Sequence, residues 1–481
     1  MMRSMFTGVT GLRVHQSRMD VIAHNIANVN TTGFKASFMT FSEAFSQTIA
    51  GASAPQPAVG RGGTNPQQIG LGANVSAIQR IMSPGAAQRT DDPLHLMING
   101  DGFFVVGDNT GLFFTRAGEF VRDAHSNVVL PGSGLQLQGW PASTVGGVLG
   151  DITVGPVQPV RITPEMETTP PQATSQLMVS GNLQQGVETW PSSINVRDSQ
   201  GNSWSIPLEF RQVSNPAYPA TAGAPQFLPN QWDLYIENPD GASTMTRSPD
   251  NAVFPTTGSL QALFPGFPAR ISFNDSGNLV AIDDAAAGLG FNASTGVLTI
   301  ELPDDLNGTA AAPADSLYNV TGAIFGRGDT IPPNAWTIDF SGLTQAAAPS
   351  SIRTADQDGL APGVLTGLSV GQDGIIEGLY SNGTRRQLWQ IPIAVFSNPA
   401  GLESLGGNVF AMTGNSGDFD GIGSLPGAVG STFMPGTLEM SNVELASEFT
   451  SMITTQRGFQ SNSRIITVSD EMLQELANLR R

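Results

Sequence analysis

Apolar residues recur at alternating spacings of four and three at both ends of the 481-residue chain, a pattern that the middle lacks. This spacing lines one face of a helix and predicts a heptad seam at each end. The N-terminal seam consists of Met5, Val9, Leu12, Gln16, Met19, Ala23 and Ile26. The C-terminal seam consists of Leu445, Phe449, Met452, Gln456, Phe459, Ser463 and Ile466, and then drifts to Ile465, Val468, Met472, Leu476 and Leu479.

Polar residues mark the inner ends of both predicted helices. Asn28–Gly33 offers cap and turn residues after the first helix, and Ser441 with Glu444 fits a capping box ahead of the second. The helices can pack on each other within one chain or against helices of other copies. Because both stripes are long for a single pair, the pattern favours contacts between copies.

From about Leu94 the apolar period changes to two, which predicts antiparallel strands and hairpins of a sandwich or barrel. The predicted strand pairs are Phe103–Val106 with Leu112–Thr115, Ile194–Arg197 with Trp204–Phe210, Ile271–Phe273 with Leu279–Ile282, and Gly374–Tyr380 with Arg386–Phe396. Trp232–Ile236 is a further strand, ended by a turn at Asn238–Gly241. Asn382-Gly383, in the turn of the last hairpin, is the strongest short hairpin signal.

Residues 35–90 show little periodicity. Ala52–Gly72 is rich in Gly, Pro, Gln, Ala and Ser, so this region is expected to be an extended linker or loop without a core of its own. The whole chain is longer than a single core usually holds, which predicts two or more domains. Its 56 glycines and 33 prolines indicate a loop-rich, β-rich protein.

The formal net charge is −18 and no basic cluster is dense enough for a nucleic-acid footprint, so neither nucleic-acid binding nor attraction to anionic membranes is expected. No apolar stretch approaches the length of a membrane-spanning helix, and Met1–Leu12 lacks the apolar core of a secretory signal peptide. The chain has no cysteine, which excludes disulfides and thiolate metal sites.

Residue patterns for catalysis, cofactors and metals are equally weak. The single lysine, Lys35, follows a phenylalanine, so a P-loop is excluded. Asp373 and Glu377 flank an exposed hairpin where nothing apolar would raise a pKa. Asp418–Gly421 resembles the start of a calcium loop, but Val429 stands where the bidentate glutamate belongs. We therefore expect no catalytic, cofactor-binding or metal site.

Short motifs at both ends resemble a known family. Gly8–Leu12 and Asn25–Lys35 look like the N-terminal signature of bacterial flagellar rod and hook proteins, which here includes Asn25, Asn28, Thr32, Gly33, Phe34 and Lys35. Ser441–Leu445 and Thr455–Arg464, with Gln456 and Arg457, resemble the C-terminal signature. Asn99–Phe104 resembles the start of the β domain that the family shares. The inserted middle segment, which opens near Thr174–Leu177, resembles that of the hook members.

The resemblance implies a multidomain, mainly β protein with an inner α-helical coiled-coil domain from both termini and two nested β-rich domains. The expected parts are an inner helical domain from residues 1–34 and 440–481, a linker over 35–90, a discontinuous first β domain from 91–172 and 356–439, and an inserted outer β domain over 173–355. A chain whose two ends meet in one layer has to leave and return through each outer layer.

The implied function is structural: many copies polymerise helically into the curved, flexible hook of the flagellum, which passes torque from rod to filament. The expected assembly residues are Met5, Val9, Leu12, Met19, Ile26, Leu445, Phe449, Met452, Phe459, Ile466, Met472 and Leu476. The implied partners are other copies, the distal rod protein, the hook–filament junction protein, the hook cap and the flagellar type III export apparatus, which would take the chain outside the cell body without a cleaved signal peptide. Two alternatives remain: a distal rod protein with an enlarged insertion, and a secreted β-rich adhesive or polysaccharide-active protein.

Overall fold

The protein is described here from a computed structural model, in which the structure describes residues 2–55, 60–145, 148–197, 200–214, 227–236, 245–248, 252–254, 268–283, 289–292, 297–301 and 335–478. The chain divides into two compact units. Unit 1 comprises Met1–Met166, Thr366–Leu379 and Arg385–Arg481, and unit 2 comprises Glu167–Leu365 and Tyr380–Thr384. Unit 2 is thus inserted into the sequence of unit 1.

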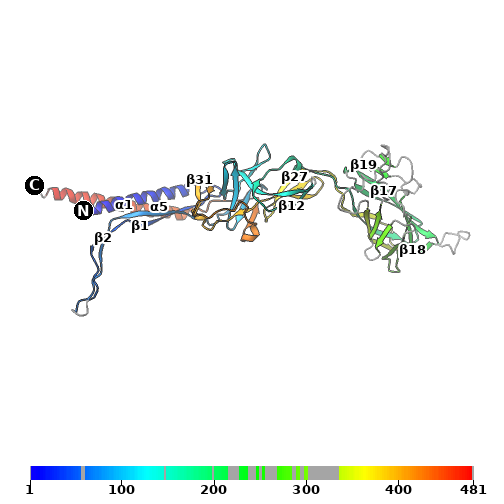
Figure 1. Cartoon of the computed structure of the whole chain (residues 1–481), viewed down its shortest axis with the longest axis horizontal. Coiled ribbons are helices and arrows are strands. Elements are labelled where there is room, and N and C mark those ends of the chain that lie inside the picture. Colours follow the sequence, from blue (N-terminus) through cyan, green and yellow to red (C-terminus); the bar gives the residue numbers. More distant parts are fainter. Residues whose placement is uncertain are drawn as a thin grey trace. The chain divides into compact units, whose positions relative to one another are not determined.

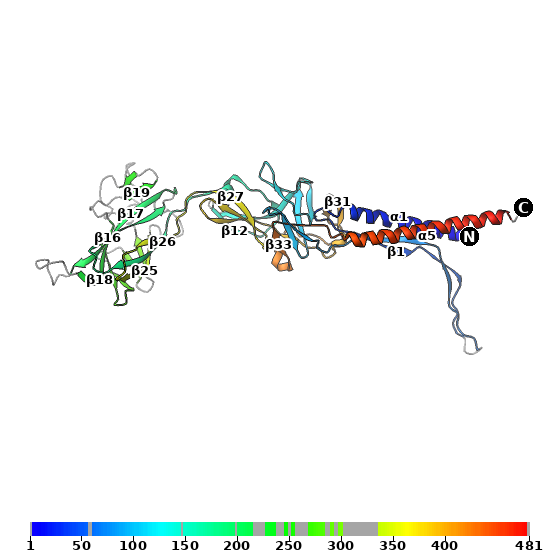
Figure 2. The same cartoon turned by 180° about the vertical axis from the view of Figure 1, so that it is seen from behind.

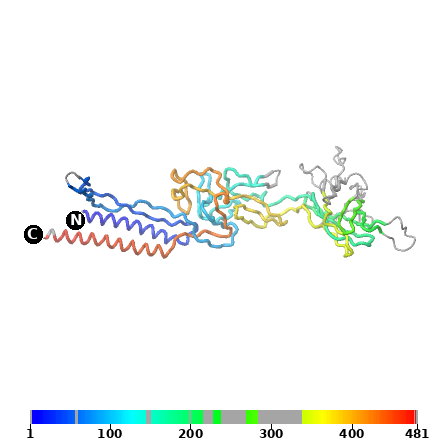
Figure 3. Tube along the Cα trace, turned by 90° about the horizontal axis from the view of Figure 1, so that it is seen from below, coloured from blue at the N-terminus to red at the C-terminus, as the bar shows by residue number. Residues whose placement is uncertain are grey.

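The two predicted terminal helices are present and belong to unit 1. Helix α1 spans Met2–Ala27 and helix α5 spans Leu445–Asn478, and they lie side by side in Figures 1 and 3. They run antiparallel, since the Ser4 and Ser469 hydroxyls are 3.4 Å apart near one end of the pair and Asn25 donates to Glu448 Oε1 near the other.

The predicted capping box does not form. Helix α5 begins at Leu445, whereas the Ser441 hydroxyl accepts a hydrogen bond from the backbone of Val443. The reason lies in Asn442, whose amide donates to the carbonyl oxygens of Ile81 and Ser83. These bonds hold the segment before α5 against the chain that precedes the β domain, so the helix starts later.

Residues 37–80, within the segment expected to be an extended linker or loop, contain paired strands. They contain β1 Ser37–Glu43, β2 Ser46–Ala50, β3 Gln67–Gly70 and β4 Ala73–Arg80. Strand β1 pairs antiparallel with β4, and β2 with β3, which forms a two-stranded ribbon. Its β1–β4 part lies beside α1, and the β2–β3 part extends away from the helices in Figure 2. The composition misled because it does not show that α1 lies beside β1 and β4, where alternate residues of β4 become half-buried.

The rest of unit 1 is a β domain. Its strands are β5 Ala87–Arg89, β6 Leu96–Asn99, β7 Phe103–Asp108, β8 Gly111–Thr115, β9 Val121–Arg122, β10 Val128–Val129, β11 Gln136–Val145, β12 Val148–Ile152, β13 Gln158–Pro159, β28 Ile375–Tyr380, β29 Arg385–Gln390, β30 Ile393–Ala394, β31 Glu403–Gly406, β32 Val409–Ala411, β33 Thr432–Pro435 and β34 Thr437–Glu439. Short helices are α2 Pro164–Glu167, η4 Pro399–Gly401 and η5 Pro426–Val429. The main sheet includes the path β28-β29-β11-β7-β8-β32-β31.

Two predicted hairpins of this domain are confirmed, with one change. Strands β7 and β8 pair as expected, and so do β28 and β29. The predicted strand Arg386–Phe396 is broken after Gln390 and resumes as β30, which pairs with β7 instead. Pro392 lies in the break, where it has no N–H to donate to a ladder.

Unit 2 is a sandwich of two sheets. The strands of these two sheets are β15 Gln176–Gln184, β16 Thr189–Arg197, β17 Ser203–Ser214, β18 Phe227–Tyr235, β19 Met245–Ser248, β20 Ala252–Phe254, β21 Ala269–Phe273, β22 Leu279–Asp283, β23 Leu289–Asn292, β24 Val297–Glu301, β25 Ala335–Ala346 and β26 Arg353–Gln357. Strand β14 Thr168–Thr169 belongs to neither sheet and pairs with β27 Gly363–Val370, which continues into unit 1 from Thr366. One sheet has the order β23-β24-β25-β15-β26, and the other β20-β19-β17-β18-β21-β22 with β16 on β17.

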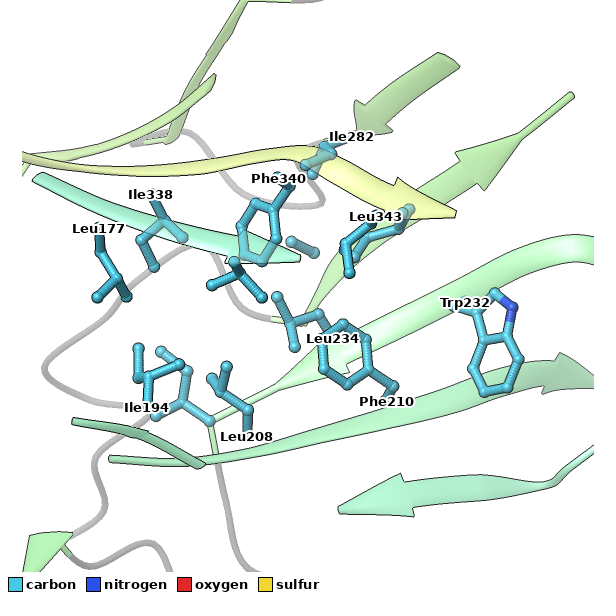
Figure 4. Packing of buried hydrophobic residues seen from close by; sticks show 14 of the residues in the cluster. Leu177, Ile194, Leu208, Phe210, Trp232, Leu234, Ile282, Ile338, Phe340 and Leu343 are labelled. Carbon is cyan, nitrogen blue, oxygen red and sulfur yellow. The ribbon is translucent and has the colours of Figure 1, made fainter. Parts of the chain in front are cut away.

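One buried apolar core fills the space between these sheets. Leu177, Ile338 and Phe340 enter it from the first sheet, while Phe210 and Trp232 enter it from the second (Figure 4). The predicted hairpins β16–β17 and β21–β22 are confirmed, and the turn at Asn238–Gly241 lies outside the described residues. Strands β15 and β25 pair in parallel, which the expectation of purely antiparallel strands missed. A parallel pair needs a long connection, and here most of unit 2 supplies it.

Candidate assembly surface and buried ion cluster

The contact between α1 and α5 is built on glycines rather than on the predicted seams. A side chain at Gly11 would collide with the Asn462 amide, and one at Gly458 would lie 2.7 Å from Cε1 of His15. Gly8 similarly faces Asn462 and Ile466. These positions let the two helices approach closely. The stripe of α1 that faces α5 follows Gly8, Gly11, His15 and Asn25, of which Gly8 and Asn25 are buried and Gly11 and His15 are half-buried.

The predicted N-terminal seam is therefore offset by one residue from the stripe that α5 covers. Met5, Leu12, Met19 and Ile26 are half-buried at the edge of the contact, and Val9 is exposed. Because one α-helical residue corresponds to a rotation of about 100°, this offset turns the apolar seam partly away from α5.

The predicted C-terminal seam is even more open. Met452 and Ile466 are half-buried, whereas Leu445, Phe449, Phe459 and Met472 are exposed, Phe449 by 49% and Phe459 by 37%. Leu476 belongs to α5, and its side chain lies outside the described part of the structure. The chain thus does not itself cover much of this apolar stripe.

A second set of uncovered apolar side chains lies on the β1–β4 ribbon. Phe45 is 77% exposed, the highest value among the large apolar residues described. The exposed members of the ribbon and its ends are Phe38, Phe41, Phe45, Ile49, Ile69, Leu71, Ile78 and Ile81. Soluble monomers rarely leave so many neighbouring apolar side chains open, so the ribbon and the seams together form a candidate assembly surface.

The inner helices are anchored to the β domain by a buried ion cluster. Lys35 Nζ lies 2.6 Å from Glu439 Oε1 and also donates to the Ser83 carbonyl at 2.7 Å. Arg116 lies 3.5 Å from the other oxygen of Glu439, and its guanidinium stacks 5.3 Å from the centre of the Phe103 ring. The three charged side chains are at most 2% exposed.

Burial controls the electrostatics of this cluster. It lowers the pKa of Lys35 and of Arg116, and in both cases the Glu439 carboxylate opposes the effect by favouring the charged form. Glu439 also accepts a hydrogen bond from the backbone of Gly85. One carboxylate therefore ties together the segment after α1, the segment after the ribbon, and the core of the β domain.

The N-terminal signature residues surround this cluster. Asn25 is buried and donates to the Ser37 carbonyl and to Glu448, while its own oxygen accepts from the Ser37 N–H. Gly33 has a φ of +67°, and a side chain there would lie 2.5 Å from the Ala117 backbone nitrogen. Phe34 is buried, with its ring centre 5.4 Å from that of His24.

The remaining signature residues have lesser roles within one chain. The Asn28 amide donates to the His24 carbonyl and its oxygen accepts from the Thr31 hydroxyl, which closes the end of α1. The Thr32 carbonyl accepts from Asn408 of the β domain. Gln456 and Arg457 are exposed on α5.

Sequence reasoning missed Glu439 and Arg116. It included Asn442 and the three helix glycines in the signature motifs, but it did not predict the contacts that they make. The only available signals were indirect: a single lysine just after a helix end, and glycines on otherwise apolar helices. Within the described residues, no group of three histidine or acidic side chains is arranged to hold a metal ion. No described helix is both long and apolar enough to cross a membrane.

Four family models, all of flagellar rod or hook proteins, match segments of this chain. Residues 5–35 match the flagella basal body rod protein model, 97–182 the flagellar hook protein FlgE/F/G D1 domain, 171–360 the flagellar basal body protein FlaE D2 domain, and 434–479 the flagellar basal body rod FlgEFG protein C-terminal model.

The full-length relatives of this chain show which flagellar proteins it resembles in sequence over its whole length. The chain is 34% identical to the flagellar hook protein FlgE of Borreliella burgdorferi and 33% identical to that of Treponema pallidum, with 100% of both chains covered in each comparison. It is 30% identical to the Escherichia coli hook protein over 98% of both chains. A solved Helicobacter pylori hook protein, FlgE2, is 13% identical with a TM-score of 0.43, covering 73% of this chain and 100% of that one. The chain belongs to the flagellar hook protein family and is a structural subunit of the hook.

Proposed function

We propose that copies of this chain polymerise helically into a curved, flexible tube that acts as a universal joint and passes torque from rod to filament. The observation that carries the proposal is the candidate assembly surface. Phe449 and Phe459 on α5 and Phe45 on the ribbon stay exposed in the single chain. Neighbouring copies would cover them, and the gain is about 25 cal/mol for each Å² of apolar surface removed from water.

The arrangement suits an open polymer. The exposed seam of α5 and the exposed ribbon are different surfaces, so a contact between one copy's seam and another copy's ribbon is head-to-tail and does not have to close into a ring. The ion cluster would hold the inner helices and the β domain together in each copy. We propose that bending is accommodated by polar contacts between the outer β units, while the helical layer keeps the tube intact.

The nested domain layout supports the same proposal. The expected outer domain, residues 173–355, falls inside unit 2, and the expected inner helical segments are the ones that α1 and α5 occupy. We propose that the helices line the inside of the tube and unit 2 lies outside. The physical argument is that apolar helices gain most from the layer in which they are surrounded by copies, while the acidic β units remain soluble towards water.

The partners follow from the place of a hook in a flagellum. We propose contacts with the distal rod protein at the base and with the hook–filament junction protein at the far end. The hook cap would act during growth, and the flagellar type III apparatus would export the chain. The role is structural rather than catalytic, which agrees with the family.

Electron microscopy of the purified, polymerised full-length chain tests the proposal. We expect tubes that curve, and we expect them to be lost when Phe45 and Ile49 on the ribbon are both replaced by serine. A matched control replaces Ser46 and Thr48 with alanine, which changes exposed polar positions of the same strand. Rigid, straight polymers from the unaltered chain would instead favour the rod alternative, and normal tubes from the Phe45/Ile49 variant would exclude the ribbon from assembly.

A further inference from the structure

His15 occupies a junction of three elements in unit 1. It lies on α1, directly opposite Gly458 of α5, where a side chain would come within 2.8 Å of its Nε2. On its other side the ring meets Phe41 of β1 edge-on, with ring centres 5.9 Å apart. Figure 2 shows these three elements next to one another. The imidazole therefore fills the space that joins the helix pair to the ribbon.

The surroundings of the ring favour its neutral form. Within the described part of the chain, the buried Nδ1 atom of His15 has no hydrogen-bond partner. A proton added there would create a buried donor without an acceptor, which carries the full cost of desolvation. Burial lowers the pKa of His15 below its usual 6.5, and the positive charge of Arg18 lowers it further.

Charged groups on the surrounding elements do not supply a counter-charge to the ring. On α1, the Arg18 guanidinium lies 5.4 Å from the centre of the same Phe41 ring, so protonation would place two cations around one aromatic side chain. On α5 the residue next to Gly458 is Arg457, another cation. On β1, Phe41 is paired with Val75 of β4, which is uncharged. The acidic residue of β1, Glu43, lies beyond Phe41 along the strand and next to Gly70.

We propose that His15 makes the packing of α1 against α5 and the ribbon sensitive to acid: the neutral ring holds the junction closed, and the protonated ring opens it. The proposal depends on close approach, because Gly458 lets α5 lie against the His15 ring, whose Nδ1 atom is buried without a partner. It concerns each chain by itself and does not rest on how copies assemble.

The pH range follows from the direction of the pKa shift. Opened chains bind a proton at His15 with the ordinary pKa near 6.5, whereas the closed junction binds it only at lower pH. Closed packing is thus fully favoured above pH 6.5 and is lost as the pH falls from 6.5 towards the lower value. Between these two limits a single proton changes the opening equilibrium by up to about tenfold for each pH unit.

Two measurements on the full-length chain test this. Selective labelling of histidine Cε1 gives one resonance for each of the four histidines, and the His15 resonance is assigned by its loss in His15→Phe. We expect it to titrate below the ordinary value of 6.5. Hydrogen exchange of peptides from α1 and α5, corrected for the intrinsic effect of pH, is then followed between about pH 5 and about pH 8. We expect opening to increase as the pH falls below 6.5, with unit 2 peptides unaffected.

Two variants distinguish opening caused by protonation of His15 from opening that acid causes elsewhere in the chain. His15→Phe keeps an aromatic ring against Phe41 but cannot be protonated, so its α1 and α5 peptides are expected to lose the pH dependence. His24→Gln removes an exposed histidine from the same helix and is expected to retain it. A His15 resonance that titrates at the ordinary pKa would overturn the proposal. So would unchanged exchange on protonation, or the same acid response in His15→Phe.

Discussion

Replacing Phe459 with aspartate separates assembly from folding. In the single chain this side chain is 37% exposed on α5, near the middle of the predicted seam. It lies next to Gly458, where α5 meets His15 of α1, and more than a third of it stays exposed there. The substitution therefore alters a surface that other copies are expected to cover, far in sequence from the β cores.

The magnitude follows from the exposed fraction. A phenylalanine can bury about 200 Å², so the open 37% leaves about 75 Å² to be covered, worth about 2 kcal/mol for each subunit added. Loss of this area alone raises the critical concentration for polymerisation by about 30-fold. Aspartate adds an unpaired charge in an apolar contact, which costs more than the lost area.

Sedimentation under assembly conditions measures the critical concentration, and thermal melting of the dilute monomer measures folding. We expect Phe459→Asp to remain folded in both β units and to fail to form tubes, with Phe459→Ala intermediate. Gln460→Asp is the matched control, since it places the same charge at the next, exposed polar position. Normal tubes from Phe459→Asp would refute the inference that other copies cover this face of α5. A large fall in the melting temperature of the monomer would show instead that Phe459 stabilises the fold of the single chain.

Three further predictions concern the anchor and the ribbon. Glu439→Gln leaves Lys35 and Arg116 buried without their carboxylate and should destabilise unit 1 by about 3–5 kcal/mol in urea unfolding, with unit 2 unchanged; a shift below 1 kcal/mol would contradict the ion-cluster account. Gly33→Ala combines a positive φ with a close approach to backbone and should cost at least about 1–2 kcal/mol in the same assay, so an unchanged midpoint would count against that geometry. Deletion of residues 52–63 should leave the monomer's melting temperature unchanged but alter polymer length or stiffness in electron micrographs, because its described residues are exposed; a large drop in melting temperature would mean that they pack within the fold.

The amino-acid sequence by itself determined the elements whose signals are local. Apolar spacing of three and four predicted both terminal helices, and they occupy Met2–Ala27 and Leu445–Asn478. Asn382-Gly383 predicted the turn of β28–β29, where Gly383 takes a positive φ. Short motifs at the ends also indicated the family, because those motifs are contiguous stretches of residues. Periodicity and turn chemistry act over a few residues and can be read without knowing the fold.

Only the tertiary structure decided which helical face is covered and how the inner layer is anchored. The seam and the stripe facing α5 differ by one residue, a difference that depends on glycines of two helices meeting in space. Lys35 and Glu439 are 404 positions apart, and no local pattern pairs a lysine with so distant a carboxylate. The pairing of β1 with β4 likewise depends on a helix that lies beside it in space and half-buries alternate residues of β4. Such contacts are set by the path of the whole chain, which a local reading of the sequence does not contain.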